Sequence, residues 1–148
     1  MTPADPQFEA RVRANFAKQI IGKALGITLS DVQAGHVVLE MPFRDDLVQQ
    51  HGFIHAGVIT TALDSACGYA AFSLMPPEAE VLTVEFKSNF LRPAAGERFR
   101  FEGRVMKPGK TLIITEGRAI AISGDREKEI SAMQATMMVI TGRDGINA

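Results

Sequence analysis

The sequence contains only one cysteine in 148 residues. Cys67 therefore has no partner for an internal disulfide and cannot build a cysteine-based metal cluster, which is typical of a reducing compartment. An excess of charge is missing too, because 16 basic and 17 acidic residues leave a formal net charge of −1. This balance gives no general field for holding a polyanion, so we expect no nucleic-acid partner.

The chain also lacks the pattern of a secretion signal. Its first residues, "MTPADPQFEARVRANF", mix acidic and basic side chains where a signal peptide needs an apolar run. The most apolar stretch, from His55 to Ser73, is about long enough to cross a bilayer, but Asp64 stands at its centre. We expect a cytoplasmic protein with no membrane partner, in which this stretch is a helix of the core.

Hydrophobic spacing predicts one N-terminal helix within residues 1–22. Its apolar face repeats every fourth residue and ends near Gly22, with the members Phe8, Val12, Phe16 and Ile20. A hairpin of two strands, "TLSDV" and "HVVLEM", follows this helix. The segment from His55 is then expected to form one long helix, which ends at the two prolines of "MPPEAE".

Four further runs predict strands, with glycine or proline in each break between them. They are "EVLTVEFKSNFL", "RFRFEGRVMK", "TLIITEGRAIAI" and "EISAMQATMMVIT". "RFRFEGRV" alternates charged and apolar residues, which indicates one wet face, and "TMMVI" is apolar throughout, which indicates an interior strand.

The order of these elements predicts an α+β domain. Short connections favour antiparallel pairing, so we expect one curved antiparallel sheet wrapped around the long central helix, the hotdog fold, with the N-terminal helix added. We expect a single domain over residues 1–148, with residues 142–148 as a flexible tail.

Asp64 lies in the middle of the predicted central helix, and no basic residue occurs in that segment. At about 100° per residue, one narrow side of the helix collects small and polar residues, namely Gly57, Thr61, Asp64 and Gly68. Glycines beside a carboxylate leave room for another molecule to approach it, so the stripe indicates the floor of a site. An exposed carboxylate, or one that accepts structural hydrogen bonds, would give the same pattern.

The preceding loop, "QQHGFIHAG", brings amides, imidazoles and glycines to the start of this helix. Unpaired backbone N–H groups and the helix dipole favour negative charge there, so an oxyanion would be stabilised. His51 and His55 are candidates for proton transfer, although either would equally be an ordinary loop or packing histidine.

Three segments together resemble a known family: "QQHGFIHAGVITTALDSACGYAA", "VLTVEFKSNFLRPA" and "GKTLIITEGRAI". They are similar to the hotdog-fold acyl-CoA thioesterases of the phenylacetate-degradation type, over nearly the whole chain after the first helix. That family usually has His-Gly-Gly in the loop and an acidic residue later in the helix, which correspond here to His55-Ala56-Gly57 and Asp64. The family binds the thioester carbonyl with the backbone N–H at the position of Ala56. Alanine keeps this donor if its φ suits a residue with a Cβ, and its methyl group could narrow the acyl pocket.

The resemblance also implies roles for further residues. Gln49 corresponds to an Asn or Gln that orients the thioester or the attacking water, and the adjacent Gln50 is the alternative by a shift of register. Thr83 corresponds to a Ser or Thr that holds water near the acidic residue, although β propensity alone also explains a strand threonine.

Two basic residues resemble positions that contact the phosphates or nucleotide of coenzyme A. Arg92 lies in "LRPA", and Lys110 follows Gly109 in "PGKTL". Exposed basic residues are common at turns, so this assignment rests on the resemblance.

Thioester hydrolysis needs an attacking group and donors for the oxygen that becomes negative, with no cofactor and no metal. Asp64 would attack directly to form a mixed anhydride or accept a proton from water, and the N–H groups of Ala56 and Gly57 would hold the oxyanion. Asp64 lies two turns, about 10 Å, along the helix, so we do not expect one chain to bring both groups to one carbonyl.

This distance argues for a site shared between two chains. The resemblance likewise implies a homodimer, often assembled into a homotetramer. We expect its substrate to be an aromatic or medium-chain acyl-CoA, held in an apolar acyl pocket.

Other functions remain open. An enoyl-CoA hydratase of the same fold would use an Asp and His pair such as Asp64 and His55, but the order and spacing match the thioesterase pattern better. A non-catalytic acyl-CoA sensor would normally carry an effector region, for which 148 residues leave no room. Cys67 lacks a base to activate it, and the spacing of His51, His55 and Asp64 matches no usual zinc pattern.

Overall fold

A computed structural model describes residues 1–142 of the chain. Its first half contains α1 (Phe8–Lys18), α2 (Ile20–Leu25), β1 (Thr28–Gln33), β2 (His36–Pro42), a 3-10 helix (Asp45–Leu47) and α3 (Ala56–Phe72). Its second half contains β3 (Glu80–Phe90), β4 (Arg98–Lys107), β5 (Leu112–Ser123) and β6 (Arg126–Ile140). The predicted central helix and the six predicted strands are confirmed.

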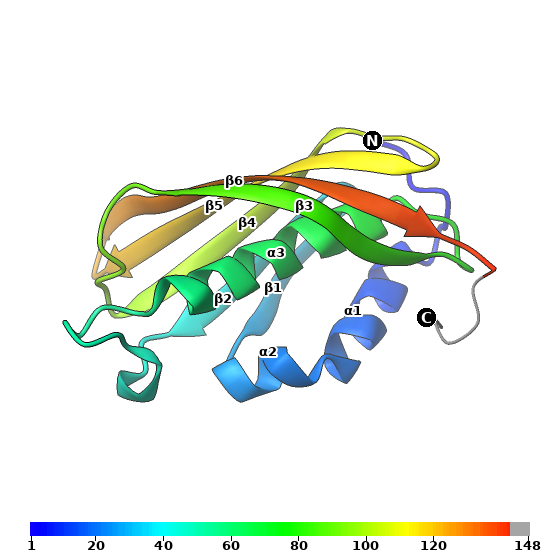
Figure 1. Ribbon diagram of the computed structural model, residues 1–148. Coiled ribbons are helices and arrows are strands. Elements are labelled where there is room, and N and C mark those ends of the chain that lie inside the picture. Colours follow the sequence, from blue (N-terminus) through cyan, green and yellow to red (C-terminus); the bar gives the residue numbers. More distant parts are fainter. Residues whose placement is uncertain (143–148) are drawn as a thin grey trace.

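The strands form one antiparallel sheet in the order β1-β2-β4-β5-β6-β3. Figure 1 shows the sheet curving over α3, which runs along its inner face. β6 is an interior strand, as its apolar sequence predicted, and β3 forms one edge of the sheet. The predicted α+β hotdog fold is confirmed.

A pair of glycines lets α3 approach the sheet closely. Gly103 of β4 and Gly117 of β5 are direct cross-strand partners. A Cβ on Gly103 would lie 2.2 Å from the carbonyl oxygen of Ala66, and a Cβ on Gly117 would lie 2.9 Å from the Cys67 sulfur. Side chains at these two positions would push the helix away, so this glycine pair fixes how deeply α3 is buried.

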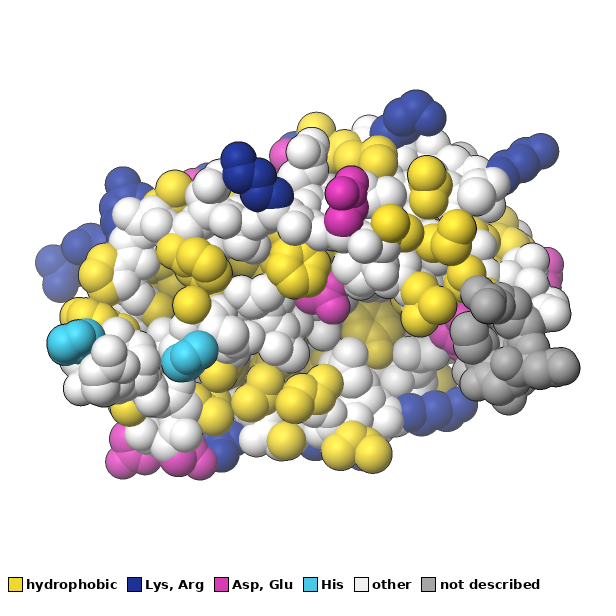
Figure 2. Space-filling model, viewed as in Figure 1, with side chains coloured by type: hydrophobic (Ala, Val, Ile, Leu, Met, Phe, Trp, Pro, Cys, Tyr) yellow, Lys and Arg dark blue, Asp and Glu magenta, His cyan; other side chains and the backbone are white. Residues whose placement is uncertain are grey.

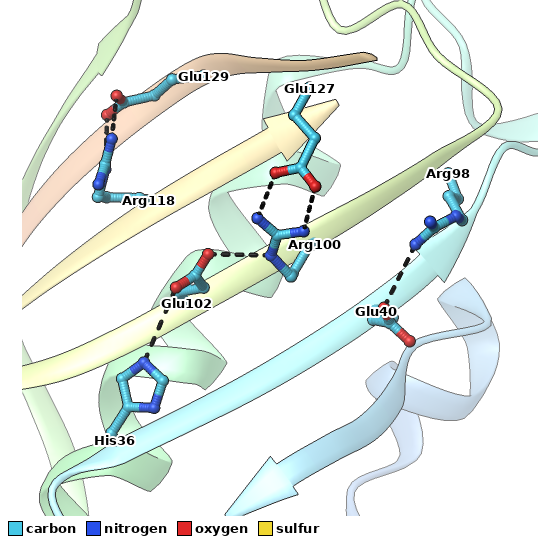
Figure 3. A network of polar contacts seen from close by, with 8 residues as sticks. All are labelled: His36, Glu40, Arg98, Arg100, Glu102, Arg118, Glu127 and Glu129. Atoms are coloured by element: carbon cyan, nitrogen blue, oxygen red, sulfur yellow. Dashed lines mark hydrogen bonds and ion pairs between the residues drawn. The ribbon is translucent and has the colours of Figure 1, made fainter. Parts of the chain in front are cut away.

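The outer face of the sheet, opposite α3, carries a ladder of ion pairs (Figure 3). Arg100 of β4 contacts both Glu102 and Glu127, and Arg118 of β5 pairs with Glu129 of β6. The intervening side chains of β4, such as Phe99 and Phe101, are fully buried. The alternation of charged and apolar residues in "RFRFEGRV" therefore corresponds to one solvent-facing side and one buried side of β4, as predicted.

The N-terminal region differs from its prediction as one helix through Gly22. α1 ends at Lys18, Gln19 adopts an extended conformation with ψ 108°, and α2 continues to Leu25. Gln19 turns its side chain toward α3, where its amide nitrogen donates to the Ser65 hydroxyl over 3.2 Å. Because of this break, Ile20 leaves the predicted apolar face and is 82% exposed.

One hydrophobic cluster extends from Val12 of α1 to Met137 of β6. The tail predicted for residues 142–148 lies, apart from Gly142, outside the described residues. Within residues 1–142, none of the helices combines the length and the apolar character needed to span a bilayer.

Candidate active site

Asp64 lies on α3 beside a cavity of about 400 Å³. We call this the mid-helix cavity, and its walls include Asn15, Gln19, Asp64, Gly68, Tyr69 and Glu80. The Asp64 carboxyl group is half-buried, and its Oδ1 accepts a hydrogen bond of 2.7 Å from the hydroxyl of Thr83 on β3. The structure therefore brings together the acidic residue and the strand threonine that the family resemblance had placed near each other.

The walls of the mid-helix cavity are mostly polar, whereas we expected an apolar acyl pocket. Among the described residues that line it, Val81 alone is aliphatic. The Tyr69 hydroxyl donates to Asn15 Oδ1 over 3.1 Å, and burial together with the nearby Glu80 carboxylate raises the pKa of Tyr69 to about 12. Tyr69 thus remains a neutral phenol at ordinary pH. A Cβ built on Gly68 meets no atom within 4 Å, so the cavity is open beside this glycine.

The first turn of α3 is capped by its own histidine. His55 Nδ1 accepts a hydrogen bond of 2.8 Å from the Gly57 N–H, and the His55 carbonyl accepts from the Val58 N–H over 3.0 Å. The Gly57 N–H is therefore engaged, contrary to its prediction as a free oxyanion donor. Among residues 1–142, the Ala56 N–H has no hydrogen-bond partner. This leaves Ala56 as the free donor at the helix start.

Alanine fits the position where the related family has glycine. No non-glycine residue in the described part of the chain has a positive φ, so Ala56 needs no glycine-like backbone. Gly57 is more restricted, because a Cβ there would lie 3.0 Å from His55 Nδ1 and would disturb the cap. The first turn therefore depends on glycine at position 57 and tolerates alanine at position 56.

Gln49 organises the loop that leads to α3. Its side-chain Oε1 accepts hydrogen bonds from the His51 N–H over 2.6 Å and from the Phe53 N–H over 3.2 Å. Its side-chain amide nitrogen donates no hydrogen bond to any residue from 1 to 142. Gln50 is exposed, so the structure favours Gln49 of the two predicted glutamines.

A second cavity, of about 440 Å³, borders the start of α3. We call this the helix-start cavity, and its walls include Gln49, Phe53, Ala56, Phe90, Arg92 and Ile130. Arg92 is exposed and donates through Nη1 to the carbonyl of Glu129 over 2.7 Å. The cavity therefore combines an apolar wall with the free Ala56 N–H and a basic side chain. The Ala56 methyl group narrows this cavity and not the one beside Asp64.

The two cavities are separate within one chain. No described residue lines both, and eight residues of helix between Ala56 and Asp64 correspond to about 12 Å. Of the predicted stripe, only Asp64 and Gly68 line the mid-helix cavity. Thr61 instead donates its hydroxyl to the Gly57 carbonyl over 2.9 Å, within the helix. The sequence was right that one chain does not bring the carboxylate to the oxyanion donor.

The predicted coenzyme A contacts are likewise not joined in one chain. Gly109 and Lys110 lie in the β4–β5 turn beside a third cavity, of about 640 Å³, whereas Arg92 borders the helix-start cavity. A Cβ on Gly109 would lie 2.2 Å from the Leu112 carbonyl oxygen, so this glycine serves the turn.

Cys67 is fully buried between α3 and the sheet, and burial raises the pKa of its thiol to about 12. Such a thiol stays protonated and is a poor nucleophile. Within residues 1–142, no three His, Cys, Asp or Glu side chains are grouped as metal ligands would be. His51 is exposed and His55 serves as the cap of α3.

Sequence reasoning missed Asn15, Tyr69 and Glu80 as walls of the site. They come from α1, α3 and β3, and only the tertiary fold brings them together. Tyr69 carried the one usable signal, because it is the single tyrosine of the chain and lies on the predicted central helix, where a buried hydroxyl group needs a polar partner.

Known proteins match this chain over its site region and over its fold. A sequence profile of the thioesterase superfamily matches residues 51–128, more than half of the chain. A proposed esterase of Saccharolobus solfataricus is 33% identical over 96 residues, which are 65% of this chain and 68% of that protein.

Solved structures agree with these sequence matches. A thioesterase family protein from Silicibacter pomeroyi superposes with a TM-score of 0.90 at 51% identity, covering 91% of this chain and 99% of that one. The PaaI protein of the phenylacetic acid degradation operon of E. coli is 21% identical with a TM-score of 0.84, and covers 94% of this chain and 97% of that one. At 21% identity, this second similarity is evidence for the fold alone.

Proposed function

Because the chain belongs to the thioesterase superfamily and is a thioester hydrolase, we propose that it cleaves aromatic or medium-chain acyl-coenzyme A to a free acid and coenzyme A. The observation that carries this proposal is the Asp64 carboxyl group beside an open cavity, on the same helix that begins with the free Ala56 N–H. An attacking group and an oxyanion donor are what thioester hydrolysis requires.

Asp64 acts as the nucleophile or as the general base. As nucleophile, its carboxylate oxygen bonds to the thioester carbon, the C–S bond then breaks, and coenzyme A leaves as a thiolate. Water hydrolyses the acyl–Asp64 anhydride that remains. As base, Asp64 takes a proton from the water that attacks the same carbon. In both routes Thr83 holds Oδ1 by the hydrogen bond of 2.7 Å and so orients the carboxyl group.

The start of α3 stabilises the developing oxyanion. The Ala56 N–H donates to the carbonyl oxygen as it becomes negative, and the helix dipole adds to this stabilisation. Gln49 orients the thioester through its side-chain amide nitrogen, since its Oε1 is already engaged in the loop. His55 positions the donor by capping Gly57 and takes no part in proton transfer.

A homodimer formed through β3 completes the site. β3 is an edge strand with large exposed apolar side chains, Leu82, Val84, Phe86 and Phe90, which are 44% to 55% exposed. Figure 2 shows hydrophobic side chains recurring along this side of the molecule. An unpaired, apolar edge of this kind favours pairing with a second copy.

The register of β3 supports this dimer. Thr83 lines the mid-helix cavity, and Phe90 lines the helix-start cavity. If two β3 strands pair antiparallel about a twofold axis between Phe86 and Lys87, Thr83 of each chain lies close to Phe90 of the other, with the irregularity between Thr83 and Glu85 shifting the match by about one residue. Each Asp64 then faces the free Ala56 N–H of the second copy.

Coenzyme A is expected to contact Arg92 and, across the assembly, Lys110 at the Gly109 turn. Both are exposed basic residues suited to phosphate groups. Assembly of two dimers into a tetramer remains a prediction.

Release of free thiol from a panel of acyl-coenzyme A compounds tests the proposal. We expect turnover by the wild type and a loss of about a thousandfold or more in Asp64→Asn, because the amide neither attacks nor accepts a proton. The exposed Asp125→Asn is the matched control and should keep full activity. Tight binding without thiol release from any compound would indicate a sensor. Loss of enoyl absorbance from crotonyl-coenzyme A without release of thiol would indicate water addition by a hydratase.

A further inference from the structure

Gly68 stands apart from the other glycines in residues 1–142. It alone has neither a positive φ nor, beyond its chain neighbours and its own helix backbone, a described atom within 4 Å of the position that a Cβ would occupy. The structure itself explains the others: Gly103, for example, lets α3 approach the sheet, and Gly26 has a φ of 74°. Inside a helix, glycine is less favourable than alanine. Neither the backbone nor the described packing therefore accounts for glycine at position 68.

The place of Gly68 relates it to the attacking group of the proposed reaction. Gly68 lines the mid-helix cavity together with Asp64, and the two residues are four apart in α3. They therefore lie on the same side of the helix, about 6 Å apart along its axis. A side chain at position 68 would take up part of the cavity. Glycine keeps open the space that continues from Asp64 toward Tyr69.

The acyl group is the part of the substrate that fits this space. In the proposed reaction the thioester carbon lies at Asp64, and its carbonyl oxygen accepts from the Ala56 N–H of the second copy. Arg92 borders the same helix-start cavity as Ala56 and attracts the phosphates of coenzyme A. The acyl group is bonded to the thioester carbon on the side away from the sulfur, so it is directed along α3 toward Gly68.

We infer that Gly68 is a specificity residue that admits acyl groups long enough to extend one helical turn beyond the thioester carbon. This inference rests on the proposed function. One turn corresponds to a length of about 5.4 Å. A hexanoyl chain and the ring of a phenylacetyl group reach this far, whereas an acetyl group does not. The substrate class is therefore a medium-chain or arylacetyl thioester, and short acyl groups leave the space beside Gly68 empty.

The acetyl, butyryl, hexanoyl and phenylacetyl thioesters of coenzyme A test this inference through their kcat/KM. For the wild type we expect the hexanoyl and phenylacetyl compounds to exceed the acetyl compound by about tenfold or more, because buried methylene groups add to binding. Gly68→Leu should lower kcat/KM for these two compounds about a hundredfold and leave the acetyl compound within about twofold of wild type. Ala17→Leu adds the same side chain at an exposed position of α1, outside the cavity wall, and should behave as the wild type with every compound.

Gly68→Ala gives a measurement that does not depend on the folding of the leucine variant. Its methyl group favours the helix and meets no described atom, so we expect the melting temperature to rise by about 2–4 °C. The same methyl group takes up cavity space, so kcat/KM for hexanoyl-coenzyme A should fall about threefold or more while that for acetyl-coenzyme A is unchanged.

Three results would overturn the inference and leave the thioesterase proposal intact. The first is a lower melting temperature for Gly68→Ala, which would mean that protein atoms already fill the space. The second is an equal loss for the acetyl and hexanoyl compounds in Gly68→Leu, or a wild type that prefers the acetyl compound. The third is a change of oligomeric state in Gly68→Leu by sedimentation velocity, which would assign the space to the second copy. Absence of hydrolysis of every compound by the wild type would instead refute the proposed function itself.

Discussion

The start and the middle of α3 offer opposite chemistry on one helix. At the start, the free Ala56 N–H and the exposed Arg92 favour negative charge, and the adjoining cavity is largely apolar. In the middle, Asp64 and Glu80 supply carboxyl groups, and the cavity wall is polar. The start supplies the oxyanion donor, the middle supplies the attacking carboxylate, and about 12 Å of helix separates the two. Neither end alone holds both an attacking group and an oxyanion donor, and the proposed homodimer would supply the missing half of each site.

A second contrast separates the outer face of the sheet from its β3 edge. On the outer face, Arg100 and Arg118 find their acidic partners within the chain (Figure 3). Along β3, Phe86 and Val84 stay 46% and 55% exposed. The outer face is thus satisfied by one chain, whereas the β3 edge is the surface that a second copy would cover.

The sharpest test of the two ends is a mixture of two inactive variants. Ala56→Pro deletes the free N–H, and proline suits the first helical position after His55, whose ψ is 139°. We expect Ala56→Pro to lower kcat by about a hundredfold to a thousandfold, and Asp64→Asn to lower it at least as much. Refolding the two together should restore about one quarter of wild-type activity, because half of the dimers are mixed and each has one intact site.

A site contained within one chain would give no recovery in this mixture. Ala56→Ser, which keeps the N–H, is the control that separates loss of the donor from a change of side chain. Refolding either inactive variant alone by the same procedure should restore no activity.

The β3 edge is tested by placing a charge on it. Phe86→Lys should weaken the dimer and reduce kcat/KM about tenfold to a hundredfold for every substrate alike, since each monomer that forms lacks half of its site and only the remaining dimers stay active. The matched control is Phe43→Lys, which charges an exposed phenylalanine away from β3. Sedimentation velocity measures the oligomeric state. A Phe86→Lys variant that sediments as the wild type does would exclude β3 as the interface.

The fold was accessible from the sequence because it follows from local patterns, whereas the nearness of Thr83 to Asp64 was implied only by the family resemblance. The alternation of charged and apolar residues in β4, the prolines that end α3 and the loop motif before α3 can each be recognised within a few consecutive residues. The polar wall around Asp64 was not accessible, since Asn15 and Glu80 meet only through tertiary packing. The helix break at Gln19 was missed for the same reason, as its side chain bonds to Ser65, 46 residues later.

A smaller effect is expected from the hydroxyl that holds the attacking carboxylate. Thr83→Val keeps the shape of the side chain and removes the hydrogen bond of 2.7 Å to Asp64. We expect kcat to fall about tenfold with little change in KM, because the orientation of the carboxyl group suffers and the cavity does not. Thr83→Ser, which keeps the hydroxyl, should retain most of the activity. If valine and serine behave alike, the hydroxyl has no part in the reaction.

The smallest effect is expected on the outer face, where the ion pairs are complete within one chain. Arg100→Gln should lower the free energy of unfolding by only about 0.5–1 kcal/mol and leave activity and oligomeric state unchanged. The Arg100 guanidinium holds the pKa of Glu127 below its ordinary value of 4.5. The pair therefore stabilises the fold above this pH, and its contribution is lost as the pH falls through the lowered pKa. Thermal melts at pH 7 and pH 3 should show a difference between wild type and variant that shrinks at the lower pH. A loss of activity in Arg100→Gln would mean that the outer face also serves the site, and the contrast with the β3 edge would fail.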